Sequence, residues 1–202
     1  MNNENQNQQR IIFYDFETTG LNPFQDDIIE FAFKNNETVL KGLVNTTRLP
    51  LSKEVVNITN ITDDIVKDAP DIMYYKDSIL NLLSPSNPNE KIFLVAHNNN
   101  RFDRFFLQRI LRQFGTNTKD LNIYFIDTMD IAKCSMPYMR SISLKTLCKY
   151  FSIQEGTHRA MSDVIALESV YHQLIIKLAN ETKTKPTQLL DNPKLVYSVL
   201  YV

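Results

Sequence analysis

The first predicted strand and the first chemical signal both come from the stretch Arg10-Ile11-Ile12-Phe13-Tyr14-Asp15-Phe16-Glu17-Thr18-Thr19-Gly20. Its first part, residues 10–16, is apolar and rich in β-forming side chains, which predicts a buried strand. Side chains two positions apart in a strand point to the same side, so Asp15 and Glu17 should project together from the end of the strand. Gly20 lets the backbone turn sharply and leaves that end open to a ligand.

Two neighbouring carboxylates repel each other unless a cation neutralises them. Carboxylate oxygens suit hard divalent ions, so Mg²⁺ is the expected ion at Asp15 and Glu17, and Mn²⁺ should substitute for it. Taken alone, however, an Asp-x-Glu pair at a strand exit is more often a solvated surface pair. The pair therefore needs partners elsewhere in the chain before it indicates a site.

Outward along the chain, apolar periodicity and turn residues predict the remaining elements. Further strands are expected at 28–34, 38–44, 91–96 and 122–126. Helices are expected from 62 onward and at 71–83, 104–114, 143–151 and 160–179, with short packing helices in 185–202. Three strands in succession, followed by strands that alternate with helices, predict an α/β fold. Its mixed five-stranded sheet should have three antiparallel strands and then two parallel ones, flanked by helices.

Length and composition indicate one globular domain. The 202 residues and 43% hydrophobic content suit a single core, which we assign to residues 10–202. Residues 1–9 are rich in Asn and Gln, so they predict a disordered tail rather than a signal peptide. No run approaches the roughly 18 consecutive apolar residues of a membrane span, so we expect an intracellular protein without a membrane partner. With a formal net charge of −1, any attraction of nucleic acid must come from local patches and bound cations.

Two more segments carry possible site residues. Asp103 follows the strand at 91–96 and begins a helix, while His158 precedes Asp163 at the start of the last long helix. Each has a structural explanation when taken alone, because an acid at a helix start favours the helix dipole and a loop histidine is usually a surface residue. Together they are more specific, because each acid stands at a strand end or a helix start, where α/β folds build their sites.

These segments resemble the three exonuclease motifs of the DEDDh subgroup of DnaQ-like 3′→5′ exonucleases, which have an RNase H-like fold. The resemblance extends from about residue 11 to residue 179. The matching segments are Asp15–Leu21, residues 57–63, Leu94–Asp103, Ser143–Cys148 and His158–Asp163. The spacing from His97-Asn98 to Asp103 is more similar to that of the three-prime repair exonucleases that act on DNA. Thr59 stands where the family often has a histidine, which puts one usual substrate contact in doubt.

The resemblance implies a two-metal site that releases nucleoside 5′-monophosphates. Asp15, Glu17 and Asp163 would hold the ion that carries the nucleophilic water, and Asp15 would bridge to a second ion that Asp103 holds directly or through water. His158 would act as the general base, since the ordinary pKa of a histidine, about 6.5, lies near working pH.

The resemblance also implies four substrate contacts. Thr18 would meet the terminal nucleotide through its backbone, Leu21 would wedge against the last base, and Asn98 and Phe102 would line the pocket. Each of these residues also has a structural alternative: core packing for Leu21 and Phe102, and a loop cap for Asn98. Arg101 and Arg104 could contact phosphate or be solvated surface residues.

Several alternatives stay open at the level of sequence. The favoured substrate is the 3′ end of single-stranded DNA, but the motifs do not separate DNA from RNA, so an RNA 3′-end-trimming enzyme is the first alternative. A pseudo-exonuclease that binds nucleic acid or a partner without cutting is the second. A polymerase partner for proofreading and a homodimer through an exposed edge strand are further options.

Overall fold

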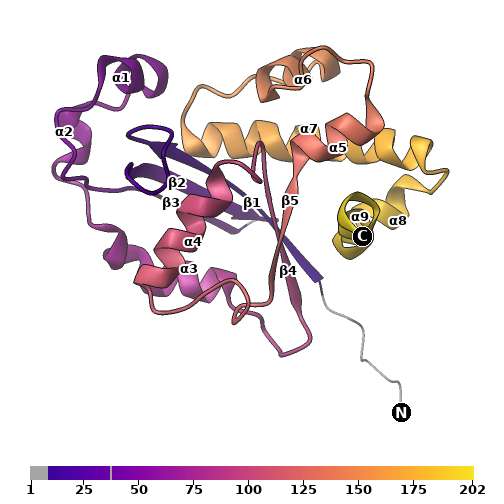
Figure 1. The fold of residues 1–202 in the computed structure, drawn as a ribbon, viewed down its shortest axis with the longest axis horizontal. Coiled ribbons are helices and arrows are strands. Elements are labelled where there is room, and N and C mark those ends of the chain that lie inside the picture. The colour runs from indigo at the N-terminus through magenta and orange to yellow at the C-terminus, as the bar shows by residue number, and fades with distance from the viewer. Residues whose placement is uncertain (1–8, 37) are drawn as a thin grey trace.

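The computed structural model describes residues 9–36 and 38–202. Five strands form one sheet in the order β3-β2-β1-β4-β5 (Figure 1). Their bounds are β1 (Gln9–Thr18), β2 (Ile28–Asn35), β3 (Thr38–Leu43), β4 (Lys91–Ala96) and β5 (Ile123–Asp127). The pairs β1–β2 and β2–β3 are antiparallel, and β1–β4 and β4–β5 are parallel. This arrangement confirms the predicted mixed sheet. Of the predicted tail, residues 1–8 lie outside the described residues, and Gln9 is the first residue of β1.

Helices follow the strands along the chain. Their bounds are α1 (Lys53–Thr59), α2 (Asp63–Val66), the 3₁₀ helix η1 (Ile72–Tyr75), α3 (Lys76–Leu83), α4 (Asp103–Gln113), α5 (Thr128–Ser135), α6 (Leu144–Phe151), α7 (Ala160–Glu181), α8 (Pro186–Leu190) and α9 (Pro193–Tyr201). Among the described residues, no helix combines the length and the apolar character needed to cross a membrane.

The sequence pattern does not predict α1 and α5. Helix α1 buries only Thr59, so it shows no apolar stripe, and its start is fixed by the Ser52 side chain, which accepts a hydrogen bond from the Val55 amide. Helix α5 begins directly where β5 ends, without a loop, because the Asp127 carboxylate accepts from the Met129 amide at 2.9 Å. Helices α1 and α5 are therefore defined by side-chain caps at their starts, which the periodicity of apolar residues does not reveal.

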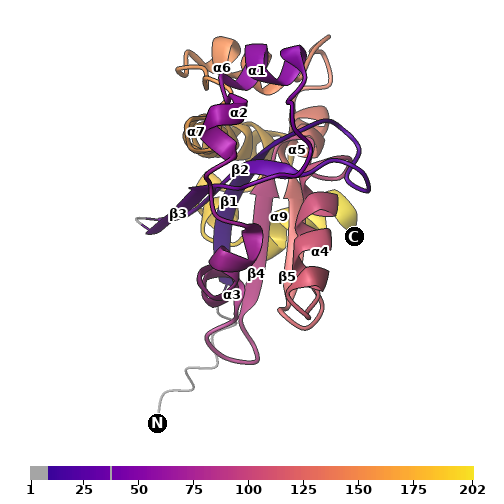
Figure 2. The ribbon, with the colours of Figure 1, turned by 90° about the vertical axis from the view of Figure 1, so that its left-hand side faces the viewer.

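The sheet has a helical layer on each face (Figures 1 and 2). Phe13 of β1 packs into the cluster that contains the buried side of α7, while its neighbours Ile12 and Tyr14 pack into the cluster formed with α3 and α4. Alternation along the strand continues past the core, so Asp15 and Glu17 lie on the α7 side with Phe13. The pleat of β1 therefore points the Asp15 and Glu17 carboxylates toward α7, the helix that contains Asp163.

Candidate active site

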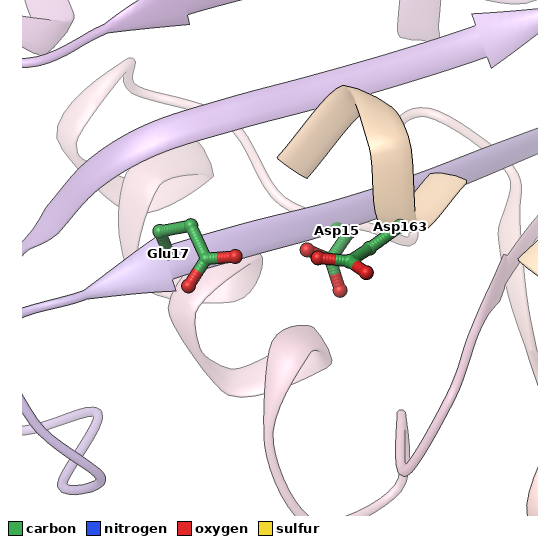
Figure 3. A group of neighbouring side chains, drawn as sticks. All are labelled: Asp15, Glu17 and Asp163. Carbon is green, nitrogen blue, oxygen red and sulfur yellow. The ribbon is translucent and has the colours of Figure 1, made fainter. Parts of the chain in front are cut away.

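Three carboxylates converge where β1 meets the start of α7. Asp15, Glu17 and Asp163 each offer an oxygen, and these oxygens all lie within 4.8 Å of one another (Figure 3). Asp15 and Glu17 come from alternate positions of β1, and Asp163 comes from the first turn of α7. We call these three residues the acidic cluster. Carboxylate oxygens gathered at this spacing are the donor set that Mg²⁺ or Mn²⁺ prefers.

The start of α7 is anchored to β2 by an ion pair. Arg159, the residue before the helix, donates to the Glu30 carboxylate from Nη2 at 2.6 Å and from Nε at 3.0 Å. The backbone amide of Ala160 donates to the same carboxylate at 2.9 Å. Glu30 lies opposite Glu17 in the β1–β2 register, so this contact fixes α7 next to the acidic cluster. No role for Glu30 was predicted from the sequence, and here it is an anchor.

Gly156 leaves room for the Asp163 carboxylate. A Cβ atom built on Gly156 would lie 1.7 Å from Asp163 Oδ1 and 3.0 Å from the Asp163 Cα. Such contacts are impossible for any residue with a side chain unless the loop or the carboxylate moves. The loop before α7 therefore packs its backbone directly against one member of the acidic cluster, a role that sequence analysis did not assign to Gly156.

Asp103 is a fourth acid, buried at the start of α4. It is 2% exposed, and its Oδ1 atom has no hydrogen-bond partner among the described residues. Burial raises the pKa of Asp103 to about 8. The negative charge of Asp103 in turn raises the pKa of Asp15, although Asp103 is not one of the three converging residues. A buried carboxylate oxygen without a partner is costly, and a cation beside it would offset that cost.

The pKa values of the three acids in the acidic cluster are raised as well. Burial, followed by repulsion from Asp103, Glu17 and Asp163, raises the pKa of Asp15 well above its ordinary value. The pKa of Glu17 rises to about 8, first through burial and then through repulsion from Asp163 and its other acidic neighbours. Burial also raises the pKa of Asp163. The donor set therefore fits a divalent cation, since the attraction of each carboxylate to such an ion would outweigh the repulsion between the carboxylates.

His158 stands at the edge of the acidic cluster. It is exposed, lies in the loop before α7, and has a left-handed backbone with φ of 53°. The charge of His158 and a hydrogen bond from its backbone both lower the pKa of Asp163, which partly opposes the effect of burial. The predicted base is therefore close enough to Asp163 for the two charges to interact, and it is exposed to solvent. The other two histidines have structural contacts: His97 Nδ1 bonds Thr128 Oγ1 at 2.9 Å, and His172 packs edge-on against Phe13.

A pocket of about 460 Å³ adjoins the acidic cluster, and we call it the nucleotide pocket. Three of the four predicted substrate contacts, Thr18, Leu21 and Phe102, line it together with Glu17. Thr59, which replaces the histidine usual in similar sequences, also lines it. Helix α1 and the residue before it supply a further wall of the nucleotide pocket, which was not predicted because α1 itself was not predicted. The lining residues of this wall are Ser52, Glu54, Val55 and Ile58.

Asn98 is the predicted contact that does not line the nucleotide pocket. Its backbone is left-handed, with φ of 64°, and its amide donates to Asp127 Oδ1 at 3.0 Å. The Asp127 carboxylate also accepts from the Asn100 amide at 2.9 Å, so it shapes the loop that leads to Asp103. The position of Asn98 fits the loop-cap alternative. Two arginines were predicted as possible phosphate contacts. Arg101 is exposed, and Arg104 donates to Asn100 Oδ1 at 3.2 Å.

The fold and the site together define the class of this protein. A sheet in the order β3-β2-β1-β4-β5, with acids gathered at the end of its central strand, is the RNase H-like arrangement that the three motifs predict. A family model described as Exonuclease matches residues 12–171, so the chain belongs to the exonuclease family, a family of nucleases. The class of enzyme predicted from the motifs is thereby confirmed.

Several polymerases contain a similar segment. The PolC-type DNA polymerase III of Bacillus subtilis is 33% identical over 190 residues, which are 91% of this chain and 12% of the polymerase. That of Listeria welshimeri is 34% identical over 168 residues, which are 80% of this chain and 11% of the polymerase. The chain thus spans about an eighth of the length of these relatives. Both relatives are polymerases. The greater likeness of this chain to three-prime repair exonucleases, which the spacing before Asp103 predicts, therefore stays a prediction.

Solved structures of exonuclease I share the fold. One superposes with a TM-score of 0.69 at 21% identity, covering 84% of this chain and 41% of exonuclease I. E. coli exonuclease I in complex with a dT13 oligonucleotide also gives 0.69, at 20% identity, covering 91% of this chain and 43% of that protein. At this level of identity the similarity establishes the fold.

Proposed function

We propose that this protein is a metal-dependent 3′→5′ exonuclease that hydrolyses terminal phosphodiester bonds and releases nucleoside 5′-monophosphates. The observation that carries the proposal is the acidic cluster, whose three carboxylate oxygens lie within 4.8 Å of one another beside an open pocket. Holding these carboxylates together against their mutual repulsion costs free energy, and a bound cation offsets this cost by attracting each carboxylate. Membership of the exonuclease family agrees with this chemistry.

The residues present suit two divalent ions, Mg²⁺ in the first place and Mn²⁺ as a substitute. Asp15, Glu17 and Asp163 would hold one ion, and Asp103 with Asp15 would hold the other. When bound, the ions supply positive charge at the attacking and leaving oxygens of the displacement. The imidazole of His158 takes a proton from the attacking water through a ring nitrogen. Thr18, Leu21 and Phe102 hold the terminal nucleotide in the nucleotide pocket.

The 3′ end of single-stranded DNA is the favoured substrate. Two observations support this: the polymerase relatives act in a DNA context, and exonuclease I has been solved with DNA oligonucleotides. The same relatives favour a proofreading role beside a polymerase over an independent repair role. DNA as substrate also agrees with an intracellular location.

A degradation ladder tests the proposed function. We expect the purified chain to shorten a 5′-labelled single-stranded DNA oligomer one nucleotide at a time with Mg²⁺ or Mn²⁺, to act more slowly on RNA of the same sequence, and to stop in EDTA. Asp15→Asn should abolish cleavage, while Asp120→Asn, an exposed acid outside the site, should cleave at the normal rate. Faster shortening of RNA would make the chain an RNA-trimming enzyme. No shortening of either polymer with either ion would leave a binding protein without nuclease activity.

A further inference from the structure

Two large apolar side chains stand in solvent on the loop that follows β1. Leu21 is 83% exposed and Phe24 is 80% exposed. Leu21 is accounted for as a predicted substrate contact, but Phe24 has no role in the site described above. Phe24 is also the more costly residue to expose, because a phenyl ring carries a large apolar surface.

The loop is held in place, so the exposure of Phe24 is built into the structure. The Asn22 side chain accepts from the Phe24 amide at 3.0 Å, and the Asp26 carboxylate accepts from the Asn22 amide at 2.8 Å. From helix α4, Arg109 donates to the Pro23 carbonyl at 2.8 Å. These contacts fix the turn and leave the ring pointing away from the core.

Phe24 borders a hollow of about 440 Å³ that adjoins the nucleotide pocket. Phe24, Arg101 and Phe105 line this hollow together with Leu21, and Leu21 also lines the nucleotide pocket. The two depressions therefore share one lining side chain, Leu21. Arg101 is exposed, so it adds a positive charge beside the two rings. Because the formal net charge of the chain is −1, the attraction of a polyanion to this hollow would have to come from a local cation such as Arg101.

We propose that Phe24, Phe105 and Arg101 form an upstream subsite for single-stranded nucleic acid, which binds the nucleotides on the 5′ side of the terminal one. Aromatic faces stack on any base, and an arginine beside them contacts the backbone phosphate. A strand whose last nucleotide lies in the nucleotide pocket and whose upstream nucleotides pass Leu21 would reach this hollow. The subsite deepens the proposed exonuclease function and rests on it.

Kinetics on two substrates separate the subsite from the catalytic centre. The p-nitrophenyl ester of thymidine 5′-monophosphate carries no upstream nucleotide, whereas a ten-nucleotide DNA strand does. Phe24→Ala should raise KM for the strand by about 10- to 100-fold, the range seen when one stacking side chain is removed, and should leave hydrolysis of the ester unchanged. Phe24→Trp should restore the normal KM. Tyr74→Ala removes an equally exposed aromatic that lines neither depression, so it should have no effect.

A binding measurement tests the subsite without relying on cleavage. The chain contains no tryptophan, so Phe24→Trp introduces a single fluorescent reporter. In an Asp15→Asn background, titration with the same DNA strand should quench this tryptophan through stacking, and the matched Tyr74→Trp reporter should stay unquenched. Equal quenching of both reporters, or none, would overturn the subsite. Equal loss of activity by Phe24→Ala on strand and ester would overturn it too, because Phe24 would then act on the catalytic centre. A wild-type chain that cleaves neither substrate while the Phe24→Trp reporter responds would instead refute the exonuclease function.

Discussion

Single residues in the site look ordinary until their neighbours are known. Asp103 and Asp163 stand in first turns of helices, where an acid is favourable for the helix dipole. The structure adds what the dipole does not explain: Asp163 meets Asp15 and Glu17, and Asp103 keeps a buried oxygen without a partner. These two features favour a ligand role for Asp163 and Asp103 over a role in helix capping alone.

His158 is the residue whose role can be tested most directly. His158→Ala should lower kcat by about 10²- to 10⁴-fold, the usual contribution of a general base. Binding of Mg²⁺, followed by calorimetry, should stay within about twofold of wild type, because the acidic cluster is intact. His172→Ala removes another exposed histidine, which packs against Phe13, and should leave kcat unchanged. Cleavage near the wild-type rate in His158→Ala would remove this residue from the mechanism.

At the scale of elements, the site depends on how one strand and one helix meet. The pleat of β1 puts Phe13, Asp15 and Glu17 on one side, and α7 covers that side of the sheet (Figure 1). The Arg159–Glu30 ion pair and the tight loop at Gly156 then set where α7 begins. Small displacements of this junction should therefore matter more for activity than for stability.

Gly156→Ala tests the junction. The added methyl group would overlap the Asp163 carboxylate, so we expect kcat to fall by about 10- to 100-fold, as misplacement of a catalytic group by about 1 Å typically does. The matched control is Gly115→Ala, which has open space around it but a φ of 84°. This control should cost about 1 kcal/mol of stability and no activity. Single-turnover rates and thermal melts of both variants check the prediction, and equal kcat values in the two variants would contradict it.

At the scale of the whole molecule, the crowded acids tie stability to pH. The pKa of Glu17 rises from 4.5 to about 8 and that of Asp103 from 3.8 to about 8 on folding. Between about pH 4.5 and 8 the folded protein therefore holds more protons than the unfolded chain. The free energy of unfolding of the metal-free protein must then fall as pH rises through this window and level off above it.

Melting curves in EDTA and in Mg²⁺ at pH 5 and pH 8 measure this dependence. In EDTA we expect a lower Tm at pH 8 than at pH 5, and Mg²⁺ should raise Tm more at pH 8, where protons no longer compete for the carboxylates. Glu17→Gln removes one of the titrating groups, so its metal-free Tm at pH 8 should exceed that of wild type by about 2–8 °C, which corresponds to roughly 1–2 kcal/mol. A Tm that rises from pH 5 to pH 8 in EDTA would contradict the prediction.

The strands, most of the helices and the types of residue in the candidate site were predictable from the sequence. The reason is that apolar periodicity, turn residues and the spacing of acids are local properties, readable within about ten residues of Asp15, Asp103 or Asp163. Local patterns were insufficient where a cap rather than periodicity defines an element, as at α1 and α5.

Tertiary packing, in contrast, determines which side chains share the candidate site. It brought Thr59 and α1 into the nucleotide pocket, kept Asn98 out of it, and set Phe24 and Arg101 beside Leu21. It also made Glu30 an anchor and Gly156 a neighbour of Asp163. These contacts join residues far apart in the chain, and their geometry follows from how helices pack on a sheet, which no local pattern encodes.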